Sequence, residues 1–401
     1  MDSDAGPGRT SDTGPIRSGG SHSVNIIRTL VPVCVLLLWL CLPGTSATAP
    51  GESYPAVSGP CLLRFPDDHG AHPDFQTEWW YYTGNLRSSD GKPFGFQLTF
   101  FRRRLIPPGH EGTLAEPASK WRTAQVYLAH AAVSDITGKR FHHAERMSRG
   151  TLGFAGTLDS PGTTTVFLGN WSAELGAEIH RLRADTGEFS IDLDLRPGKP
   201  PVLHGQSGYS RKGRRPESAS CYYSLTRLEA EGSIGLEGKS VSVQGTAWMD
   251  HEFSSAALES DLEGWDWFSL QLSDGTELMI YLLREKGGLV SAASSGTLVE
   301  RSGSTIHIES TDMEAQATEH WTSPDTGVRY PQEWSFRIRS PDMEFTVVSN
   351  LPNQEMRTPG TTGVTYWEGS VTARGRRAGT SFEAQGYMEL TGYDKPMAGV
   401  F

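Results

Sequence analysis

Short segments that alternate between apolar and polar residues, or run apolar with β-branched and aromatic side chains, dominate the sequence. Clusters of turn-forming residues such as SSDG, ITGK, LSDG and RSGS separate them. No segment keeps a helical period over three turns, so the pattern predicts a large antiparallel β protein built from barrels or sandwiches. The six clearest predicted strands are Phe94–Phe101, Ala124–Asp135, Phe189–Leu195, Leu278–Arg284, Ser304–Ser310 and Met343–Ser349.

An internal repeat indicates that one β unit occurs twice. The Trp-rich hairpin of residues 79–103 resembles that of residues 265–284, and each has a Ser-Asp-Gly turn between its strands. A later strand, VQGTAWMD at 243–250, resembles AQGYMEL at 384–390. We therefore expect two similar domains, at 73–253 and 254–401, with chance similarity between hairpins as the alternative.

The two copies differ in their last residues. The first ends in Asp250, His251 and Glu252, whereas the second ends in Glu389, Leu390 and Thr391. If the copies are equivalent, we expect only the first to keep an ionisable cluster.

Composition excludes several classes of protein. With 401 residues, 37% hydrophobic and 21% charged, the chain is long enough for two globular domains. Its net charge of −11 argues against a nucleic-acid partner, because there is no basic stripe to neutralise phosphates. The basic run at 210–215 lies among Gly, Ser and Pro and is interpreted as a solvated loop. Walker, G-x-S-x-G and HExxH motifs are absent from the sequence.

The N-terminus has the pattern of a secretory signal. Three arginines precede the apolar run LVPVCVLLLWLCLPG, which is too short to span a membrane comfortably, and small residues follow it. We expect a signal peptide within 1–49, cleaved after Ala47 or Ala49, and a periplasmic or secreted protein. An uncleaved anchor that keeps the protein near a membrane is the alternative. The Pro-, Gly- and Ser-rich segment 50–72 is interpreted as a linker.

Two cysteines remain once the signal is removed, Cys61 and Cys221. An oxidising compartment would allow one bridge between them, but their spacing does not show whether they meet. Two cysteines cannot form a structural zinc site alone, and the sequence has no CxxC pair.

The segment GTAWMDHEFSS places three ionisable residues inside an aromatic stretch. On a strand, Asp250 and Glu252 share one face with Trp248, and His251 lies on the other. Two carboxyl groups inside a barrel raise each other's pKa, so one could stay protonated and act as a general acid. The alternative is that both face water or pair with an arginine (Arg102, Arg103 or Arg227).

Aromatic and small polar residues alternate on other predicted strands. In EWWYY, Glu78 and Trp80 share one face, while Trp79 and Tyr81 share the other. A mixture of large aromatic and polar side chains is typical of a ligand cavity, with an aromatic core as the alternative reading. The predicted ligand-binding residues are Glu78, Trp79, Trp80, Tyr81, Gln97, Trp248, Trp265 and Trp267.

Histidines give little reason to expect a metal. His130, His142 and His143 are candidate ligands, but adjacent residues on a strand point to opposite faces. We expect no metal, nucleotide or haem cofactor.

Several motifs together resemble the AttH/CrtC family, which includes AttH-like secreted proteins and the carotenoid 1,2-hydratases. They are HPDFQTEWWYYTGNL, FGFQLTFFRR, WMDHEF, GWDWFSLQLSDGTELMIYLLR, YPQEW and YWEGSV with QGYMELTGY, and they cover the chain from about residue 72 onward. The resemblance implies two lipocalin-like β domains, a small apolar ligand such as an isoprenoid or lipid, and no organic cofactor.

The resemblance also implies a chemistry. In the hydratases an acidic side chain protonates a terminal trisubstituted alkene and water captures the tertiary cation. Here this suggests Asp250 as proton donor, with His251 or Glu252 orienting it or handling the water. Aromatic faces would stabilise the cation (Trp80, Trp248 and Trp267, with Trp79 and Tyr81 nearby).

The segments EWWYY and MDHEFS are closer to the AttH branch, and the signal peptide separates the protein from pigment synthesis, so a carotenoid is not the expected substrate. We expect acid–base hydration or hydrolysis of an apolar ligand. A non-catalytic lipocalin-like carrier is the main alternative, and a carbohydrate-binding β protein is a weaker one.

Overall fold

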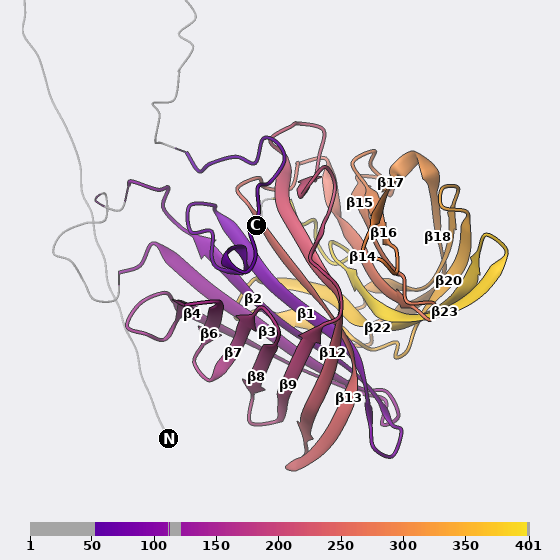
Figure 1. Cartoon of the computed structure of the whole chain (residues 1–401), viewed down its shortest axis with the longest axis horizontal. Helices are drawn as coiled ribbons and strands as arrows, with labels where there is room; N and C mark the ends of the chain where they lie inside the picture. Colours follow the sequence, from indigo (N-terminus) through magenta and orange to yellow (C-terminus); the bar gives the residue numbers. More distant parts are fainter. Residues whose placement is uncertain (1–52, 111, 113–121, 399–401) are drawn as a thin grey trace, which may run out of the picture. The chain divides into compact units, whose positions relative to one another are not determined.

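The computed structural model describes residues 53–110, 112 and 122–398; the predicted signal peptide lies outside them. The described residues form 23 strands and two 3-10 turns, η1 (Asp67–His69) and η3 (Ser310–Asp312), which confirms the all-β prediction. All strands belong to two antiparallel sheets, one of thirteen strands and one of ten (Figure 1). No described segment forms a helix with the length and apolarity needed to cross a membrane.

The first sheet has the order β4-β3-β2-β1-β13-β12-β9-β8-β7-β6-β5, with β10 and β11 paired to β12. Its strands are β1 (Thr77–Ser88), β2 (Pro93–Arg104), β3 (Gln125–Asp135), β4 (Arg140–Arg149), β5 (Ala155–Ser160), β6 (Thr163–Leu168), β7 (Trp171–Gly176), β8 (His180–Asp185), β9 (Phe189–Pro197), β10 (Val202–Leu203), β11 (Tyr209–Arg211), β12 (Ala219–Leu236) and β13 (Lys239–Ser254).

The second sheet has the order β17-β16-β15-β14-β23-β22-β20-β19-β18, with β21 paired to β22, and it curves into a nearly closed barrel (Figure 1). Its strands are β14 (Leu262–Leu272), β15 (Glu277–Glu285), β16 (Ser295–Val299), β17 (Thr305–Glu309), β18 (Met313–Thr322), β19 (Arg329–Ile338), β20 (Met343–Ser349), β21 (Glu355–Thr358), β22 (Val364–Arg377) and β23 (Thr380–Leu390). Both sheets are consistent with lipocalin-like barrels.

Each sheet packs one face around its own apolar core. In β6, Thr164, Val166 and Leu168 are buried and the residues between them are partly exposed, the period of two expected of a strand with one covered face. The strands at the centre of the first sheet are different, because the last eight residues of β13 are all buried. Both faces of that segment are therefore covered, which explains why a charged run there is not on the surface.

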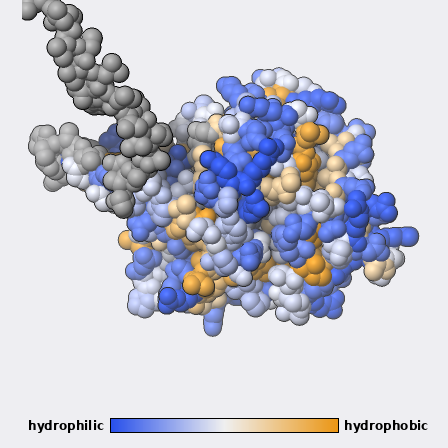
Figure 2. Space-filling view, turned by 90° about the horizontal axis from the view of Figure 1, so that it is seen from above, coloured by the Kyte–Doolittle hydropathy of each residue, from blue (hydrophilic) through white to orange (hydrophobic). Residues whose placement is uncertain are grey.

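An aromatic cluster joins the two sheets. The Tyr81 and Trp267 rings meet edge to face with centroids 5.3 Å apart, and Trp267 Nε1 donates a hydrogen bond to Tyr222 Oη at 3.1 Å. Tyrosine and tryptophan suit a contact between sheets, because their rings bury a large apolar area while the Tyr hydroxyl and the Trp N–H form hydrogen bonds. Apolar residues on the outer face drawn in Figure 2 lie in small groups among hydrophilic ones.

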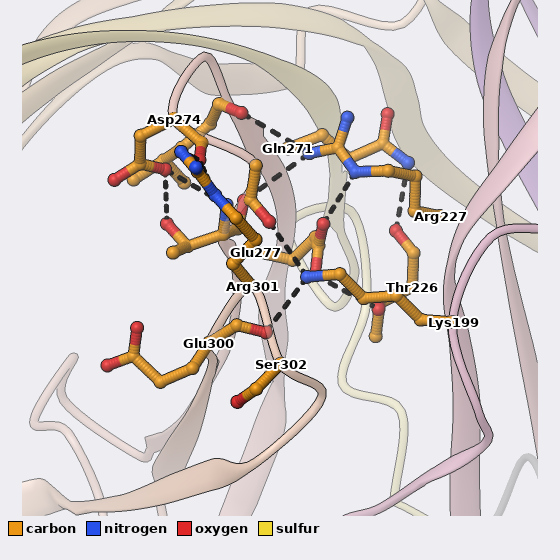
Figure 3. A network of polar contacts seen from close by, with 12 residues as sticks. Lys199, Thr226, Arg227, Gln271, Asp274, Glu277, Glu300, Arg301 and Ser302 are labelled. Carbon is orange, nitrogen blue, oxygen red and sulfur yellow. Dashed lines mark hydrogen bonds and ion pairs between the residues drawn. The ribbon is translucent and has the colours of Figure 1, made fainter.

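A buried polar network also joins the sheets (Figure 3). Glu277 on β15 is fully buried and receives Lys199 Nζ at 2.7 Å and Arg227 Nε at 2.6 Å, both from the first-sheet region. Lys199 Nζ also donates to the backbone oxygens of Gly275 and Glu300. Breaking such a network costs more than breaking a surface ion pair, because it leaves buried charge uncompensated.

The segment that composition suggests is a linker is attached to the first sheet. A disulfide joins Cys61 to Cys221 on β12, with the Cα atoms 5.9 Å apart. His69 is buried, with Nδ1 2.7 Å from Tyr223 Oη, and its backbone oxygen accepts a hydrogen bond from Trp80 Nε1 at 3.0 Å. Residues 61–69 are thus held by covalent and polar contacts.

Candidate functional site

A cavity of about 170 Å³ lies between the two sheets. Side chains of β1, β2, β3, β12 and β13 form one wall, and side chains of β14, β15, β22 and β23 form the other. Most of the lining is aromatic or aliphatic, as is usual for small-molecule sites. The polar lining is concentrated in two rows of residues, one on each sheet.

Strand register builds the row on the first sheet. Ser224, Asp250, Tyr81, Thr99 and His130 lie directly opposite one another in turn, across β12, β13, β1, β2 and β3. All five side chains are buried. Because opposite residues on one sheet point to the same face, five separate segments contribute one continuous polar row.

The row on the second sheet arises in the same way. Glu368, Glu389, Trp267 and Tyr281 are opposite one another across β22, β23, β14 and β15, and all four line the cavity. Two acidic side chains therefore stand side by side on the wall that faces Asp250.

Asp250 is held by three hydrogen-bond donors. Tyr222 Oη donates at 2.7 Å, Trp248 Nε1 donates at 2.6 Å, and the Ser224 hydroxyl donates as well. Burial raises the pKa of Asp250 to about 7, against the effect of these donors and with a smaller contribution from Glu252. Near neutral pH the group can therefore exist in either protonation state.

Glu368 and Glu389 have a different environment. Burial, followed by the charge of Glu389, raises the pKa of Glu368 well above its usual range. Burial raises the pKa of Glu389 to about 7, although Trp265 Nε1 donates to its Oε2 at 2.7 Å. Neither carboxyl oxygen of Glu368 has a hydrogen-bond partner of good geometry among the described residues. The pair is therefore suited to hold a proton.

Glu252 is neutralised inside the cavity. Its Oε1 lies 3.1 Å from Lys212 Nζ, which also lies over the rings of Tyr222 and Tyr281 at 4.7 and 4.3 Å from their centroids. Burial lowers the pKa of Lys212, but Glu252 and Tyr281 raise it by more, so the net shift of the pKa is upward. This ion pair places a fixed positive charge at the edge of an otherwise acidic site.

The structure brings most of the predicted site residues to the cavity. Asp250, Glu252, Trp79, Tyr81, Trp265 and Trp267 line it. Trp248 does not line the cavity but donates to Asp250 from the same face of β13. Gln97 is buried beside Thr99, to which its amide donates, and does not line the cavity either.

Three predicted residues lie on the opposite face of the first sheet. His251 Nε2 is 2.9 Å from Glu78 Oε1, and the Trp80 ring is stacked against His251 with centroids 4.8 Å apart. None of the three lines the cavity. Sequence alternation separates them correctly from Asp250 and Trp79, but it cannot show which face a ligand meets.

Glu78, His72 and His251 are also the described residues that could hold a metal ion, with ligand atoms within 4.8 Å of one another. However, Glu78 already accepts hydrogen bonds from Arg102 Nε at 2.8 Å and from the backbone nitrogen of His72. Despite burial, the hydrogen bonds from His251 and His72 hold the pKa of Glu78 well below its usual range. These contacts make the group an ionic link between residue 72, β1, β2 and β13.

The expectation that only the first repeat keeps an ionisable cluster is wrong. Glu389 faces the same cavity as Asp250, and its neighbour Glu368 is the acidic residue of the motif YWEGSV, which the sequence does not single out as a site residue. The repeat itself carried the signal for Glu389, because Trp-Met-Asp at 248–250 corresponds to Tyr-Met-Glu at 387–389. Thr99, which alternates with Gln97 on the same predicted strand, also lines the cavity. The sequence does not indicate Phe101, His130, Lys212, Tyr222 or Tyr366 as ligand contacts, although they line it too.

Comparison with known proteins identifies relatives. The AttH-like family model matches residues 56–393. A crystal structure of a putative AttH from Nitrosomonas europaea is 34% identical, with a TM-score of 0.74, covering 84% of this chain and 99% of that one. Kievitone hydratase from Nectria haematococca is 16% identical with a TM-score of 0.64, covering 86% and 98%, and shares the fold. Comparison with curated proteins gave no match.

Proposed function

The chain belongs to the AttH-like family, and from that premise we propose that the cavity between its sheets binds an apolar alkene and adds water to it. One observation carries this proposal: three carboxyl groups with raised pKa values, of which Asp250 and Glu368 are buried and Glu389 is partly buried, face a cavity with mainly apolar walls. Protonation of an alkene carbon needs an acid that is still protonated at the working pH, in a site with little bulk water.

The aromatic walls support the same chemistry. Protonation leaves a positive charge on the more substituted carbon, and Trp79, Tyr81 and Trp267 line the cavity that would hold that carbon. Aromatic faces stabilise cations, and more strongly in a desolvated site. The similarity in fold to kievitone hydratase, named for a hydration, is consistent with this assignment.

Two acid–base roles must be filled in such a hydration. One group gives a proton to the less substituted alkene carbon, and another accepts a proton from the water that adds to the cation. Asp250 and the Glu368–Glu389 pair lie on opposite walls, so a ligand between them would meet one on each side. His251 points away from the cavity and takes no direct part.

Mass spectrometry of ligand exposed to the protein tests the proposal. Wild type and Asp250→Asn are incubated with the isoprenoid alcohols geraniol and farnesol, and both folded proteins are extracted. We expect wild type to yield a product heavier by one water, and the variant to retain unaltered ligand. The same unaltered ligand from both proteins would indicate a carrier.

We also propose that the protein is exported. The N-terminal sequence has the signal pattern, and the bond between Cys61 and Cys221 suits an oxidising compartment. Cell fractionation with N-terminal sequencing of the mature protein tests this, and a cytoplasmic protein that retains Met1 would contradict it.

A further inference from the structure

We propose that Glu368 is the proton donor of this reaction, that Asp250 is the base that accepts a proton from water, and that Tyr366 and His130 connect Glu368 to the surface. The inference rests on the proposed function and assigns its two roles. It differs from the role for Asp250 that the sequence suggests.

The hydrogen-bond environments of the two acids are opposite. Asp250 receives three donors, from Tyr222, Ser224 and Trp248, and donors stabilise a carboxylate. No hydrogen bond of good geometry reaches Glu368 among the described residues, although the Tyr81 and Tyr366 hydroxyls lie beside it and favour its carboxylate. Glu368 is also 1% exposed and lies directly opposite Glu389. Burial and the neighbouring carboxyl group outweigh the two hydroxyls, so Glu368 is held in its protonated form. Groups with environments that differ in this way divide into acid and base.

A chain of hydrogen bonds fixes the direction in which Tyr366 points its proton. The Thr361 hydroxyl donates to the Glu145 carboxylate, so Thr361 Oγ1 must accept from His130 Nε2, which is 2.9 Å away. His130 Nδ1 is then an acceptor and receives the Tyr366 hydroxyl proton at 2.8 Å. Burial lowers the pKa of His130 to about 3, consistent with the neutral ring that this arrangement needs.

This direction has a consequence for Glu368. The Tyr366 hydroxyl lies beside the Glu368 carboxyl, and with its own proton given to His130 it can only accept there. A hydrogen bond between the two therefore requires a proton on Glu368. The chain ends at Glu145, which is partly exposed, so it connects Glu368 to the surface. In the direction described it passes a proton outward, and its hydrogen bonds and the His130 tautomer must reverse before it can return a proton to an ionised Glu368.

The reaction then balances as follows. The Glu368 proton forms a C–H bond with the less substituted alkene carbon as the π bond breaks, leaving a tertiary cation and the Glu368 carboxylate. A water molecule forms a C–O bond with the cation and gives one proton to Asp250. Transfer from Asp250 to solvent restores the base. Once the hydrogen bonds of the chain have reversed, transfer of a proton from solvent through it to Glu368 restores the acid and returns the chain to its first direction. The sum is alkene plus water to give a tertiary alcohol.

Infrared spectroscopy of the protein without ligand tests the protonation state. At about pH 8.5, groups with a pKa of about 7 such as Asp250 and Glu389 are mainly ionised. We expect wild type to retain the carbonyl band of a protonated carboxylic acid there. Glu368→Gln should abolish the band, and Glu252→Gln, in the same cavity but paired with Lys212, should leave it. Tyr366→Phe should keep the band but shift its frequency, because one acceptor is lost.

Turnover of farnesol separates this inference from the proposed function. If wild type adds water and folded Glu368→Gln is slower by about 10²–10⁴-fold, the donor role holds. If Glu368→Gln is as active as wild type, or if its spectrum keeps the acid band, the inference is overturned while hydration stands. If wild type shows the band but converts no alkene, the proposed function fails and the donor role fails with it. Tyr366→Phe should lower kcat with little change in KM.

Discussion

Glu368 and Glu389 lie directly opposite each other on β22 and β23, and both line the cavity, with Glu368 buried and Glu389 partly buried. Like charges at such positions destabilise a sheet, so the pair is maintained at the expense of stability. Active sites often retain groups that the fold would be more stable without. Substitutions in this pair can therefore be tested for their effect on folding stability separately from their effect on turnover.

The pair predicts that folding stability decreases as pH rises. Folding raises the pKa of Glu389 from 4.5 to about 7, so the folded state binds its proton more tightly than the unfolded state does. Stability from this group is complete below about pH 4.5 and is lost as pH rises to about 7. Glu389→Gln should reduce this dependence, gaining about 1–3 kcal/mol at pH 8 relative to wild type and little at pH 4. The raised pKa values of Asp250 and Glu368 account for the dependence that remains. Urea unfolding across the pH range measures it.

Glu383 on the same strand provides the control. It is exposed and pairs with Arg374 in solvent, so Glu383→Gln should change stability by less than about 1 kcal/mol at either pH. An equal gain from both substitutions would indicate a general charge effect and not the buried pair.

Tyr222→Phe should change the pH dependence of turnover. The hydroxyl donates to Asp250 and lowers its pKa, so its removal raises that pKa further. If ionised Asp250 is the base, the acidic limb of the kcat/KM profile moves to higher pH. Loss of the acceptor for Trp267 Nε1 should also cost about 1–3 kcal/mol of stability.

The matched variant is Tyr281→Phe. This hydroxyl also lines the cavity, but it contacts Ser210 and the backbone of Arg211, so both limbs should stay in place. Movement of the basic limb in Tyr222→Phe, with the acidic limb unchanged, would show that Asp250 acts as the acid instead.

Glu277→Gln should weaken the contact between the sheets. Its carboxylate compensates Lys199 and Arg227, and the substitution leaves two largely buried cations without their partner (Figure 3). We expect a loss of about 3–5 kcal/mol by chemical denaturation. The combined Lys199→Met, Arg227→Met and Glu277→Leu variant should recover much of it, and a loss as large as that of the single variant would contradict the ionic explanation.

Cys61→Ser with Cys221→Ser should destabilise the protein by about 2–5 kcal/mol. The bond closes a loop across a sequence separation of 160 residues, and loops of that length are costly to close in the unfolded chain. A reducing agent should lower the melting temperature of wild type and leave the double variant unchanged. Equal melting temperatures with and without reductant in wild type would show that the thiols are free.

Much of the fold follows from alternation in the sequence. The predicted strand 124–135 nearly coincides with β3, and 94–101 lies inside β2, because side-chain periodicity and turn residues are local properties. The same rule places Asp250 with Glu252, and Trp79 with Tyr81, on faces that the structure shows lining one cavity.

The rest depends on tertiary structure. Alternation shows which residues share a face but not what covers that face. It therefore cannot show that His251 and Trp80 lie on the face of the first sheet opposite the cavity. The opposition of Glu368 and Glu389 is set by the register of β22 against β23, which neither segment specifies alone.

The most direct test of the central claim is turnover of farnesol in ¹⁸O-labelled water, followed by mass spectrometry. If the cavity hydrates an alkene, wild type should release an adduct that carries one labelled oxygen. Asp250→Asn and Glu368→Gln should bind farnesol and release it unlabelled. Recovery of unlabelled farnesol from wild type, at full binding occupancy, would contradict the claim and identify the protein as a carrier.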